Sequence, residues 1–245
     1  MTITTVGLDA DDTLWHNETV FRLTQARFLD LLTDHDNAEI EARLAAIERR
    51  NLQLYGYGVK GFTLSMIETA MEMCGGEPPP GVIREILAAG REMLAHPVET
   101  LPGVDEALAR LSERYRLVLV TKGDLMDQER KLAASGLGEL FAAVEIVSEK
   151  DRGTYERVFA RHGTGSGEAV MAGNSMKSDV LPALEAGAWA VHIPYAVTWA
   201  HELADPPEGH PRFGELDRID DLPDWIAGRE EGDGPFPLVG AFRGR

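Results

Sequence analysis

The stretch Val6-Gly7-Leu8-Asp9-Ala10-Asp11-Asp12-Thr13-Leu14 joins the end of an apolar run to two closely spaced carboxylates near the start of the chain. The run from Ile3 to Leu8 is short and mainly apolar, which is typical of a strand buried on both faces of a parallel sheet. Asp9 and Asp11 follow its carboxyl end, where open α/β sheets bind their ligands. Charges placed there are costly unless they are compensated, usually by a divalent cation. A D-x-D pattern alone is more often an acidic loop, so the rest of the chain must decide between such a loop and a cation-binding site.

Composition limits the class of protein. The chain has 245 residues, 44% of them hydrophobic, which is enough for a globular core. No apolar run approaches the length of a membrane span, and no basic-then-apolar secretory signal is visible. Cys74 is the only cysteine, which excludes an internal disulfide framework and a cysteine-based zinc site. We therefore expect a cytoplasmic protein with no membrane association.

The charge balance is strongly acidic. Asp and Glu number 41 against 24 Lys and Arg, a formal net charge of −17. Nucleic-acid partners demand clustered basic residues, so none is expected. Acids outnumber bases most clearly between Glu202 and Asp233, a run that predicts a solvated surface. A small anionic substrate would also be repelled, so a phosphate site requires local cations, for which Lys122, Lys150 and a metal are the candidates.

The chain has two parts that differ in their hydrophobic pattern. Between Asn17 and Pro97 the apolar residues recur with a helical period, and no strand pattern is convincing. Four helices are expected here, separated by short loops, and this arrangement is typical of an antiparallel bundle. The helices are expected at about residues 17–32, 36–56, 63–74 and 82–94.

After Pro97 strands and helices alternate, a pattern that predicts a parallel sheet covered on both faces. The expected fold class is α/β: a doubly wound, Rossmann-like parallel-sheet core with an inserted all-α helical-bundle cap domain. The core would comprise residues 1–15 and 97–245, and the cap residues 16–96. The Gly-rich end from about Gly228 is expected to be a loose tail. Strands are expected at about residues 116–120, 143–147, 168–172 and 188–193, with helices between them.

Polar clusters follow the successive strands. They are Thr121-Lys122-Gly123-Asp124, Glu149-Lys150-Asp151 and Gly173-Asn174-Ser175-Met176-Lys177-Ser178-Asp179, in addition to the acid pair after the first strand. Each cluster alone is weak evidence. Because the carboxyl ends of parallel strands meet at one edge of a sheet, we expect all four clusters to converge on one site.

These four clusters, in this order, resemble the four motifs of the haloacid dehalogenase superfamily, and the resemblance covers the chain to about Asp224. It implies that Asp9 is a nucleophile, Asp11 a general acid and base, Thr121 a phosphoryl-oxygen ligand and Lys150 a charge-stabilising group. It also implies Mg²⁺ as cofactor, held by the Asp9 side chain, the Asp11 backbone carbonyl and the Asn174/Asp179 cluster. The implied reaction is hydrolysis of a small phosphorylated metabolite through an aspartyl-phosphate.

The chemistry of these residue types agrees with that reaction. Phosphoryl transfer needs a nucleophile and stabilised oxygens, and a carboxylate nucleophile divides hydrolysis into two easier steps. Thr121 and the backbone N–H groups of Lys122 and Gly123 suit phosphoryl oxygens. His16, beside the first motif, and Lys60, in the cap, are further candidates for substrate contact. Each is as readily explained as a surface residue.

Two features leave alternatives open. Asp11 favours a phosphatase over a 2-haloacid dehalogenase, because halide departure needs no proton, whereas a phosphomutase would share all four motifs. Asn174 stands where the superfamily often has aspartate, which removes one negative charge from the metal site. A metabolite- or phosphate-binding protein that has lost catalysis is therefore the alternative from another class. The sequence leaves the substrate undetermined, and it is compatible with a monomer or a homodimer.

Overall fold

A computed structural model of the chain describes residues 2–197, 199 and 202–231. Its centre is a six-stranded, all-parallel sheet with the order β3-β2-β1-β4-β5-β6. The winding reverses at β1, which lies between β2 and β4, so the predicted doubly wound sheet is confirmed. The strands are β1 (Thr5–Leu8), β2 (Arg116–Lys122), β3 (Ala143–Val147), β4 (Ala169–Gly173), β5 (Trp189–His192) and β6 (Phe213–Glu215).

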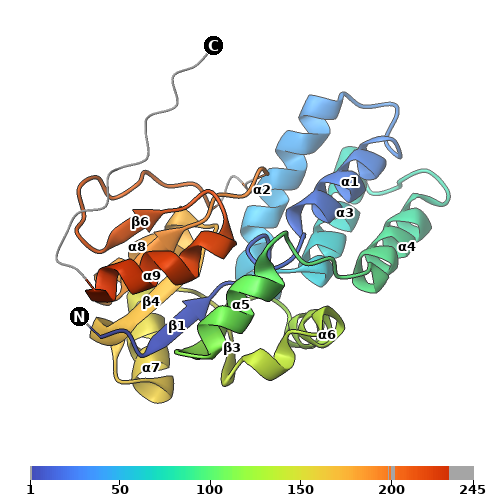
Figure 1. The fold of residues 1–245 in the computed structure, drawn as a ribbon. Helices are drawn as coiled ribbons and strands as arrows, with labels where there is room; N and C mark the ends of the chain where they lie inside the picture. The colour runs from blue at the N-terminus through green and yellow to red at the C-terminus, as the bar shows by residue number, and fades with distance from the viewer. Residues whose placement is uncertain (1, 198, 200–201, 232–245) are drawn as a thin grey trace, which may run out of the picture.

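Side chains alternate between the two faces of the sheet, and each face has its own core. Leu117 and Leu119 of β2 belong to one core, whereas Val118 and Val120 belong to the other. Figure 1 shows α5 and α9 side by side over the first face. The first face is covered by α5 (Val104–Ser112), by α9 (Leu222–Glu231) and by Leu132 of α6 (Leu125–Ser135). The second face is covered by α7 (Arg152–His162) and α8 (Leu181–Glu185). A π-helical turn, Met176–Val180, directly precedes α8.

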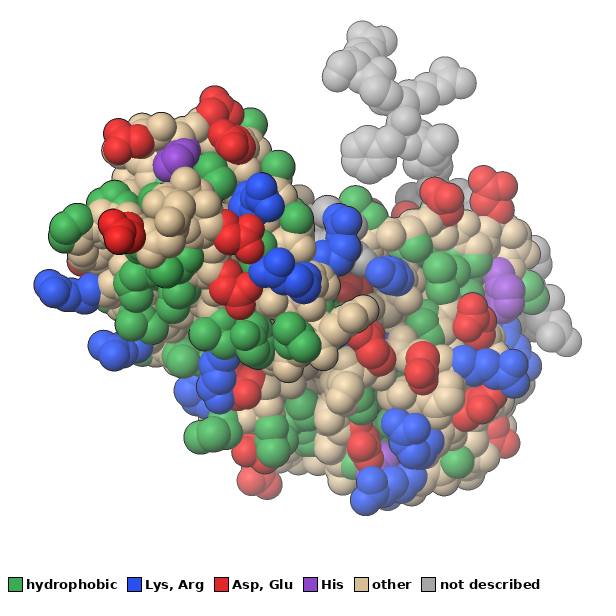
Figure 2. Space-filling model, turned by 180° about the vertical axis from the view of Figure 1, so that it is seen from behind, with side chains coloured by type: hydrophobic (Ala, Val, Ile, Leu, Met, Phe, Trp, Pro, Cys, Tyr) green, Lys and Arg blue, Asp and Glu red, His purple; other side chains and the backbone are tan. Residues whose placement is uncertain are grey.

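Four helices between β1 and α5 form a separate bundle, here called the helical insertion. They are α1 (Glu18–Leu29), α2 (Asn37–Tyr55), α3 (Val59–Met73) and α4 (Val82–Ala95). The bundle packs around its own buried residues, among them Phe28, Ile40, Phe62, Met66 and Ile86. It lies to one side of the sheet (Figure 1), and from behind the molecule has two lobes with acidic and basic side chains interspersed (Figure 2).

The chain enters the insertion through Asp12, which lies in the left-handed backbone region with a φ of 62°. A short polar side chain tolerates this conformation because it bonds to the nearby backbone. The Asp12 carboxylate accepts hydrogen bonds from the backbone N–H groups of Asn17 and Glu18, at 2.8 and 3.0 Å. It thereby caps the first turn of α1 from outside the helix and ties the loop after β1 to the insertion.

Some predicted boundaries were wrong. The third helix begins at Val59 rather than near residue 63, and β6 and α9 were not predicted. The expected loose tail from Gly228 is wrong as far as Glu231, because α9 runs to that residue, and its remainder lies outside the described residues. The buried side chains of Leu222, Trp225 and Ile226 explain the helix, since they cover the sheet. No helix among the described residues is long and apolar enough to cross a membrane.

Candidate active site

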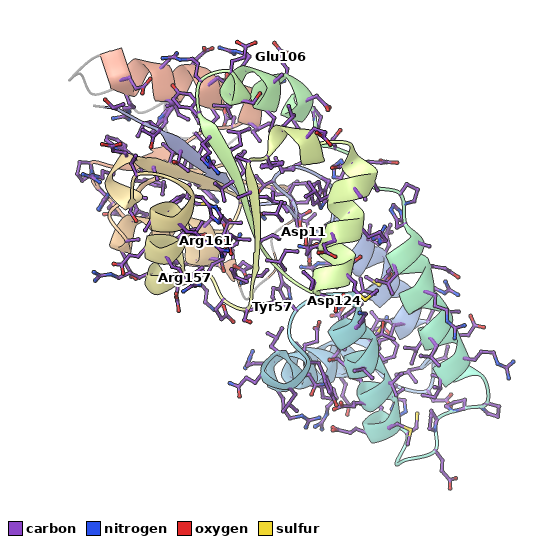
Figure 3. All side chains as sticks on the ribbon, turned by 90° about the horizontal axis from the view of Figure 1, so that it is seen from below. Asp11, Tyr57, Glu106, Asp124, Arg157 and Arg161 are labelled. Atoms are coloured by element: carbon purple, nitrogen blue, oxygen red, sulfur yellow. The ribbon has the colours of Figure 1, made fainter. Side chains whose placement is uncertain are left out.

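The polar clusters that follow β1, β2, β3 and β4 meet in one cavity of about 370 Å³ between the sheet and the helical insertion. In Figure 3, Asp11 and Asp124 from the core and Tyr57 from the insertion lie where the two parts meet, whereas Glu106 lies away on α5. The structure therefore brings together most of the residues that the sequence singled out. The cavity is lined by Asp9, Asp11, Thr121, Lys122, Gly123, Lys150, Asn174 and Asp179, among others.

Asp9 lies at the floor of this cavity and is almost fully buried. Its Oδ1 accepts a 2.5 Å hydrogen bond from Lys150 Nζ, and its Oδ2 accepts one of 2.9 Å from Thr13 Oγ1. Burial raises the pKa of Asp9 to about 7, although the nearby Lys150 ammonium opposes this shift. A bound cation would lower that pKa and keep the carboxylate ionised.

Lys150 bridges two carboxylates. Its Nζ donates to Asp179 Oδ1 at 2.7 Å as well as to Asp9, and all three side chains are buried. Burial alone would lower the pKa of Lys150, but the Asp179 and Asp9 carboxylates outweigh it and raise that pKa above its usual value. Lys150 thus carries a permanent positive charge beside the Asp9 carboxylate.

Asp179 is held in place by backbone as well as by Lys150. Its Oδ2 accepts a 2.9 Å hydrogen bond from the backbone N–H of Ser175. Position 173, just before the loop that contains Ser175, requires glycine, because a Cβ on Gly173 would lie 2.2 Å from Asp179 Oδ2. Both oxygens of Asp179 therefore already have partners, and its role as a metal ligand stays a prediction.

Oxygen atoms converge beside Asp9. One end of the Asn174 side-chain amide lies 3.2 Å from Asp9 Oδ2, the Asp11 carbonyl oxygen and Thr13 Oγ1. The amide nitrogen at this end would donate to those oxygens, whereas the amide oxygen there would complete the donor set that Mg²⁺ prefers. No three His, Cys, Asp or Glu side chains gather as a metal group within the described ranges. The residues nevertheless fit Mg²⁺, with backbone and amide oxygens supplying part of the set.

Three donors surround the Asp11 carboxylate. Oδ1 accepts from Trp15 Nε1 at 2.7 Å and from Lys131 Nζ at 2.6 Å, and Oδ2 accepts from Gln128 Nε2 at 3.1 Å. Gln128 and Lys131 lie three residues apart on one face of α6, and both are buried. Sequence analysis missed both. The signal was two polar residues on the inner face of the helix that follows the Thr121 turn.

The turn after β2 brings a buried hydroxyl and a glycine with positive φ to the cavity. Thr121 is buried, and its Oγ1 accepts a 2.7 Å hydrogen bond from Gln128 Nε2. Gly123 follows with a φ of 142°, a conformation that residues with a side chain rarely adopt. The turn then ends at Asp124, whose side chain accepts from the backbone N–H of Asp127 and caps α6.

Lys122 points toward an acidic partner. Its Nζ donates to Glu202 Oε1 at 2.7 Å and to Ser178 Oγ at 2.8 Å. Glu202 also accepts from the hydroxyls of Ser175 and Ser178. Burial alone would raise the pKa of Glu202, but Lys122 and the hydroxyls lower it to about 2. The acidic run that begins at Glu202 was expected to be a solvated surface. This expectation is wrong for Glu202 itself, because its side chain is only 15% exposed.

Two predicted substrate contacts do not line the cavity. Lys60 Nζ instead forms an ion pair with Asp124, at 2.9 and 3.0 Å from the two oxygens, and thus joins the insertion to the core. His16 is exposed, and its Nδ1 lies 2.6 Å from the Tyr195 hydroxyl. Lys60 and His16 thus lie outside the lining of the cavity, and their contact with a substrate stays a prediction.

Tyr57 forms the second link between the insertion and the core. Its hydroxyl donates to Glu149 Oε1 at 2.8 Å, and the Lys122 ammonium lies 4.2 Å from the centre of its ring. The side chain anchors one wall of the cavity to the motif that contains Lys122.

Solved structures resemble this fold. A haloacid dehalogenase-like family hydrolase from Xanthomonas campestris is 41% identical, with a TM-score of 0.83 and coverage of 94% of this chain and 95% of that chain. The putative HAD-hydrolase YfnB from Bacillus subtilis, bound to magnesium, is 16% identical, with a TM-score of 0.65 over 92% and 99% of the chains. A 2-haloacid dehalogenase from Pseudomonas syringae pv. Tomato is 19% identical, with a TM-score of 0.60 over 93% and 100%. The last two likenesses show the fold alone.

No curated protein matches the sequence. A family model described as haloacid dehalogenase-like hydrolase matches residues 3–187, about three quarters of the chain. That range includes β1 to β4 with the four polar clusters around the cavity, together with the helical insertion. From the match and the shared architecture we conclude that the chain belongs to the haloacid dehalogenase-like hydrolases.

Proposed function

We propose that this hydrolase is a Mg²⁺-dependent phosphomonoesterase that acts on a small phosphorylated metabolite. The observation that carries the proposal is the pair Asp9 and Asp11 at one end of the same cavity, one buried against Lys150 and the other held by three donors. A nucleophile and a separate proton donor are what phosphate-ester hydrolysis requires. Departure of a halide needs no proton, so Asp11 favours a phosphatase over a dehalogenase.

In the first step, a carboxylate oxygen of Asp9 attacks phosphorus and the bond to the leaving alcohol breaks. Asp11 gives its proton to that leaving oxygen. Lys150 and the N–H groups of the Thr121–Gly123 turn stabilise the charge on the phosphoryl oxygens. In the second step, Asp11 takes a proton from water, the water oxygen attacks phosphorus, and Asp9 is released with inorganic phosphate.

Asp9, the Asp11 carbonyl oxygen and Asn174 would hold the metal, where their oxygens converge. When bound, Mg²⁺ supplies positive charge that offsets the repulsion between the Asp9 carboxylate and a phosphate dianion. Lys150 remains charged beside Asp9 throughout, and Thr13 orients the second oxygen of Asp9 by its hydrogen bond.

The helical insertion would act as a cap. Its residues form one wall of the cavity, and the links Tyr57–Glu149 and Lys60–Asp124 hold it against the core. Closing such a wall over the site excludes water during phosphoryl transfer. Specificity for the leaving alcohol would therefore come from α1, α2 and α3.

The test is release of inorganic phosphate from p-nitrophenyl phosphate and from a panel of phosphorylated metabolites, with Mg²⁺ or with a chelator. Wild type should release phosphate only with Mg²⁺, and Asp9→Asn should lose at least about a thousandfold in turnover. A folded wild type without turnover on any substrate would favour the binding protein that Asn174 left open. Isomerised phosphate esters among the products would instead indicate a phosphomutase.

A further inference from the structure

Lys122 and Glu202 form an ion pair inside the cavity. The Nζ of Lys122 donates to Glu202 Oε1 at 2.7 Å and to Ser178 Oγ at 2.8 Å, and both members of the pair line the cavity. Their side chains are only 11% and 15% exposed. Water and salt screen such a pair much less than a pair on the surface, so its charges act on whatever the cavity binds.

The contacts of Lys122 leave its ammonium little freedom. Besides making the two hydrogen bonds, the ammonium lies 4.2 Å from the centre of the Tyr57 ring, whose hydroxyl is tied to Glu149. The flexible stem of a lysine ordinarily lets its ammonium turn toward a bound anion. Here a carboxylate of the chain itself already occupies that place.

Glu202 is fixed as firmly as Lys122. The hydroxyls of Ser175 and Ser178 donate to its Oε2, and the backbone N–H of Ser178 donates to Ser175 Oγ at 2.9 Å. Burial alone would raise the pKa of Glu202, but Lys122 and these hydroxyls lower it to about 2. The carboxylate is therefore ionised at neutral pH and offsets the charge of Lys122.

The pair borders the groups that would hold a phosphoryl group. Lys122 belongs to the turn Thr121–Gly123, and Ser178 directly precedes Asp179, the second carboxylate bound by Lys150. All of these residues line the same cavity. A phosphate held between the turn and Lys150 would thus lie near both charges of the pair.

A free ammonium at this position would hold the product as well as the substrate. An uncompensated charge several ångströms from an anion changes its affinity by about tenfold at the effective dielectric of a protein site. Inorganic phosphate, the product of the proposed reaction, has to leave before the next turnover, and product release limits many enzymes. An ammonium whose charge is offset avoids that retention, while the N–H groups of its turn stay available.

We propose that Glu202 is a positioning residue: it fixes Lys122 and offsets its charge, and thereby keeps the affinity of the cavity for inorganic phosphate low. The inference rests on the proposed function, because it takes the turn that contains Lys122 as the phosphoryl site. The affinity for phosphate should then follow the summed charge of the pair, whichever member is changed.

A double-mutant cycle tests this, with binding of inorganic phosphate to the Mg²⁺-loaded proteins measured by calorimetry. Glu202→Gln should tighten phosphate binding by about tenfold, because it leaves Lys122 uncompensated. Lys122→Met should weaken it by about tenfold, because it leaves the carboxylate of Glu202 uncompensated. The double variant should return to within about threefold of wild type. Where Glu202→Gln alone fails to fold, the double variant compared with Lys122→Met measures the same charge.

Turnover separates this role from a merely structural one. In Glu202→Gln the inhibition constant of phosphate against p-nitrophenyl phosphate should fall by about tenfold, whereas a partly unfolded protein would lose kcat alone. Glu208→Gln is the matched control, since Glu208 lies in the same segment between β5 and β6 but is exposed and outside the cavity.

Phosphate binding that is unchanged or weaker in Glu202→Gln, or a double variant that binds no more tightly than Lys122→Met, would overturn the proposal. The absence of phosphate binding in all four proteins would overturn it as well. A wild type that binds phosphate without turning over any substrate overturns the phosphatase function alone, because the order of the four affinities still decides the role of Glu202.

Discussion

The ammonium of Lys131 lies 2.6 Å from Oδ1 of Asp11, although 120 residues separate the two along the chain. Lys131 is 8% exposed and also donates to Asn17 Oδ1 at 3.1 Å. It therefore fixes the carboxylate of Asp11 relative to the first turn of the helical insertion. We regard Lys131 as a positioning residue for Asp11, the proton donor of the proposed reaction.

Lys131→Met should impair protonation of the leaving group. We expect a loss of about tenfold or more in turnover of alkyl phosphates, whose leaving alkoxides need a proton, and a much smaller loss with p-nitrophenyl phosphate. Arg130→Met is the control, since it removes the same charge from the neighbouring residue, which pairs with Asp127 instead. Equal losses on both substrates would contradict this role.

Asn174→Asp should strengthen metal binding. The change adds one negative charge where oxygens of Asp9, Asp11 and Thr13 already converge. The Mg²⁺ concentration that gives half-maximal phosphate release should fall by about tenfold. Asn37→Asp adds the same charge at an exposed position on α2 and should leave that concentration unchanged. An unchanged Mg²⁺ requirement in Asn174→Asp would place the metal elsewhere.

Gly173→Ala should damage both stability and activity. The new methyl group would lie 2.2 Å from Asp179 Oδ2 and displace that carboxylate from Lys150 and Ser175. We expect a decrease of about 1–3 kcal/mol in the free energy of unfolding, measured by urea denaturation. Gly167→Ala is the control, because a Cβ there meets nothing within 4 Å. A Gly173→Ala protein as stable and active as the control would refute the packing argument.

The partly buried Glu48 should make stability depend on pH. Its pKa rises from 4.5 to about 7 on folding, so the folded state binds more protons between these values. Its contribution to stability is therefore full below pH 4.5 and is lost as the pH rises through 7. Glu48→Gln should be more stable than wild type above pH 7 in denaturant titrations.

Glu202→Gln provides the contrast. The pKa of Glu202 falls to about 2 on folding, so its contribution is present above its ordinary pKa of 4.5 and is lost as the pH falls through 2. This variant should therefore be less stable than wild type at neutral pH. A Glu48→Gln protein that behaved like Glu202→Gln would contradict the burial that raises the pKa of Glu48.

The sequence by itself determined the parallel sheet and the convergence of its motifs. Alternating apolar strands and helices after Pro97 allow few topologies, and strands that run parallel must end at one edge. Asp9, Asp11, Thr121, Lys150 and Asn174 could thus be placed around one site before their distances were known. The helices of the insertion could also be predicted from the sequence, because hydrophobic periodicity is a local property of the chain.

Only the tertiary structure decided which side chains face one another. Gln128 and Lys131 reach Asp11 because α6 packs with one face toward the end of β1, and Glu202 meets Lys122 from a distant loop. Lys60, by contrast, pairs with Asp124 and does not itself line the cavity. Local patterns specify strands and helices, whereas the partner of a charged side chain depends on burial and on distances between segments far apart in the chain.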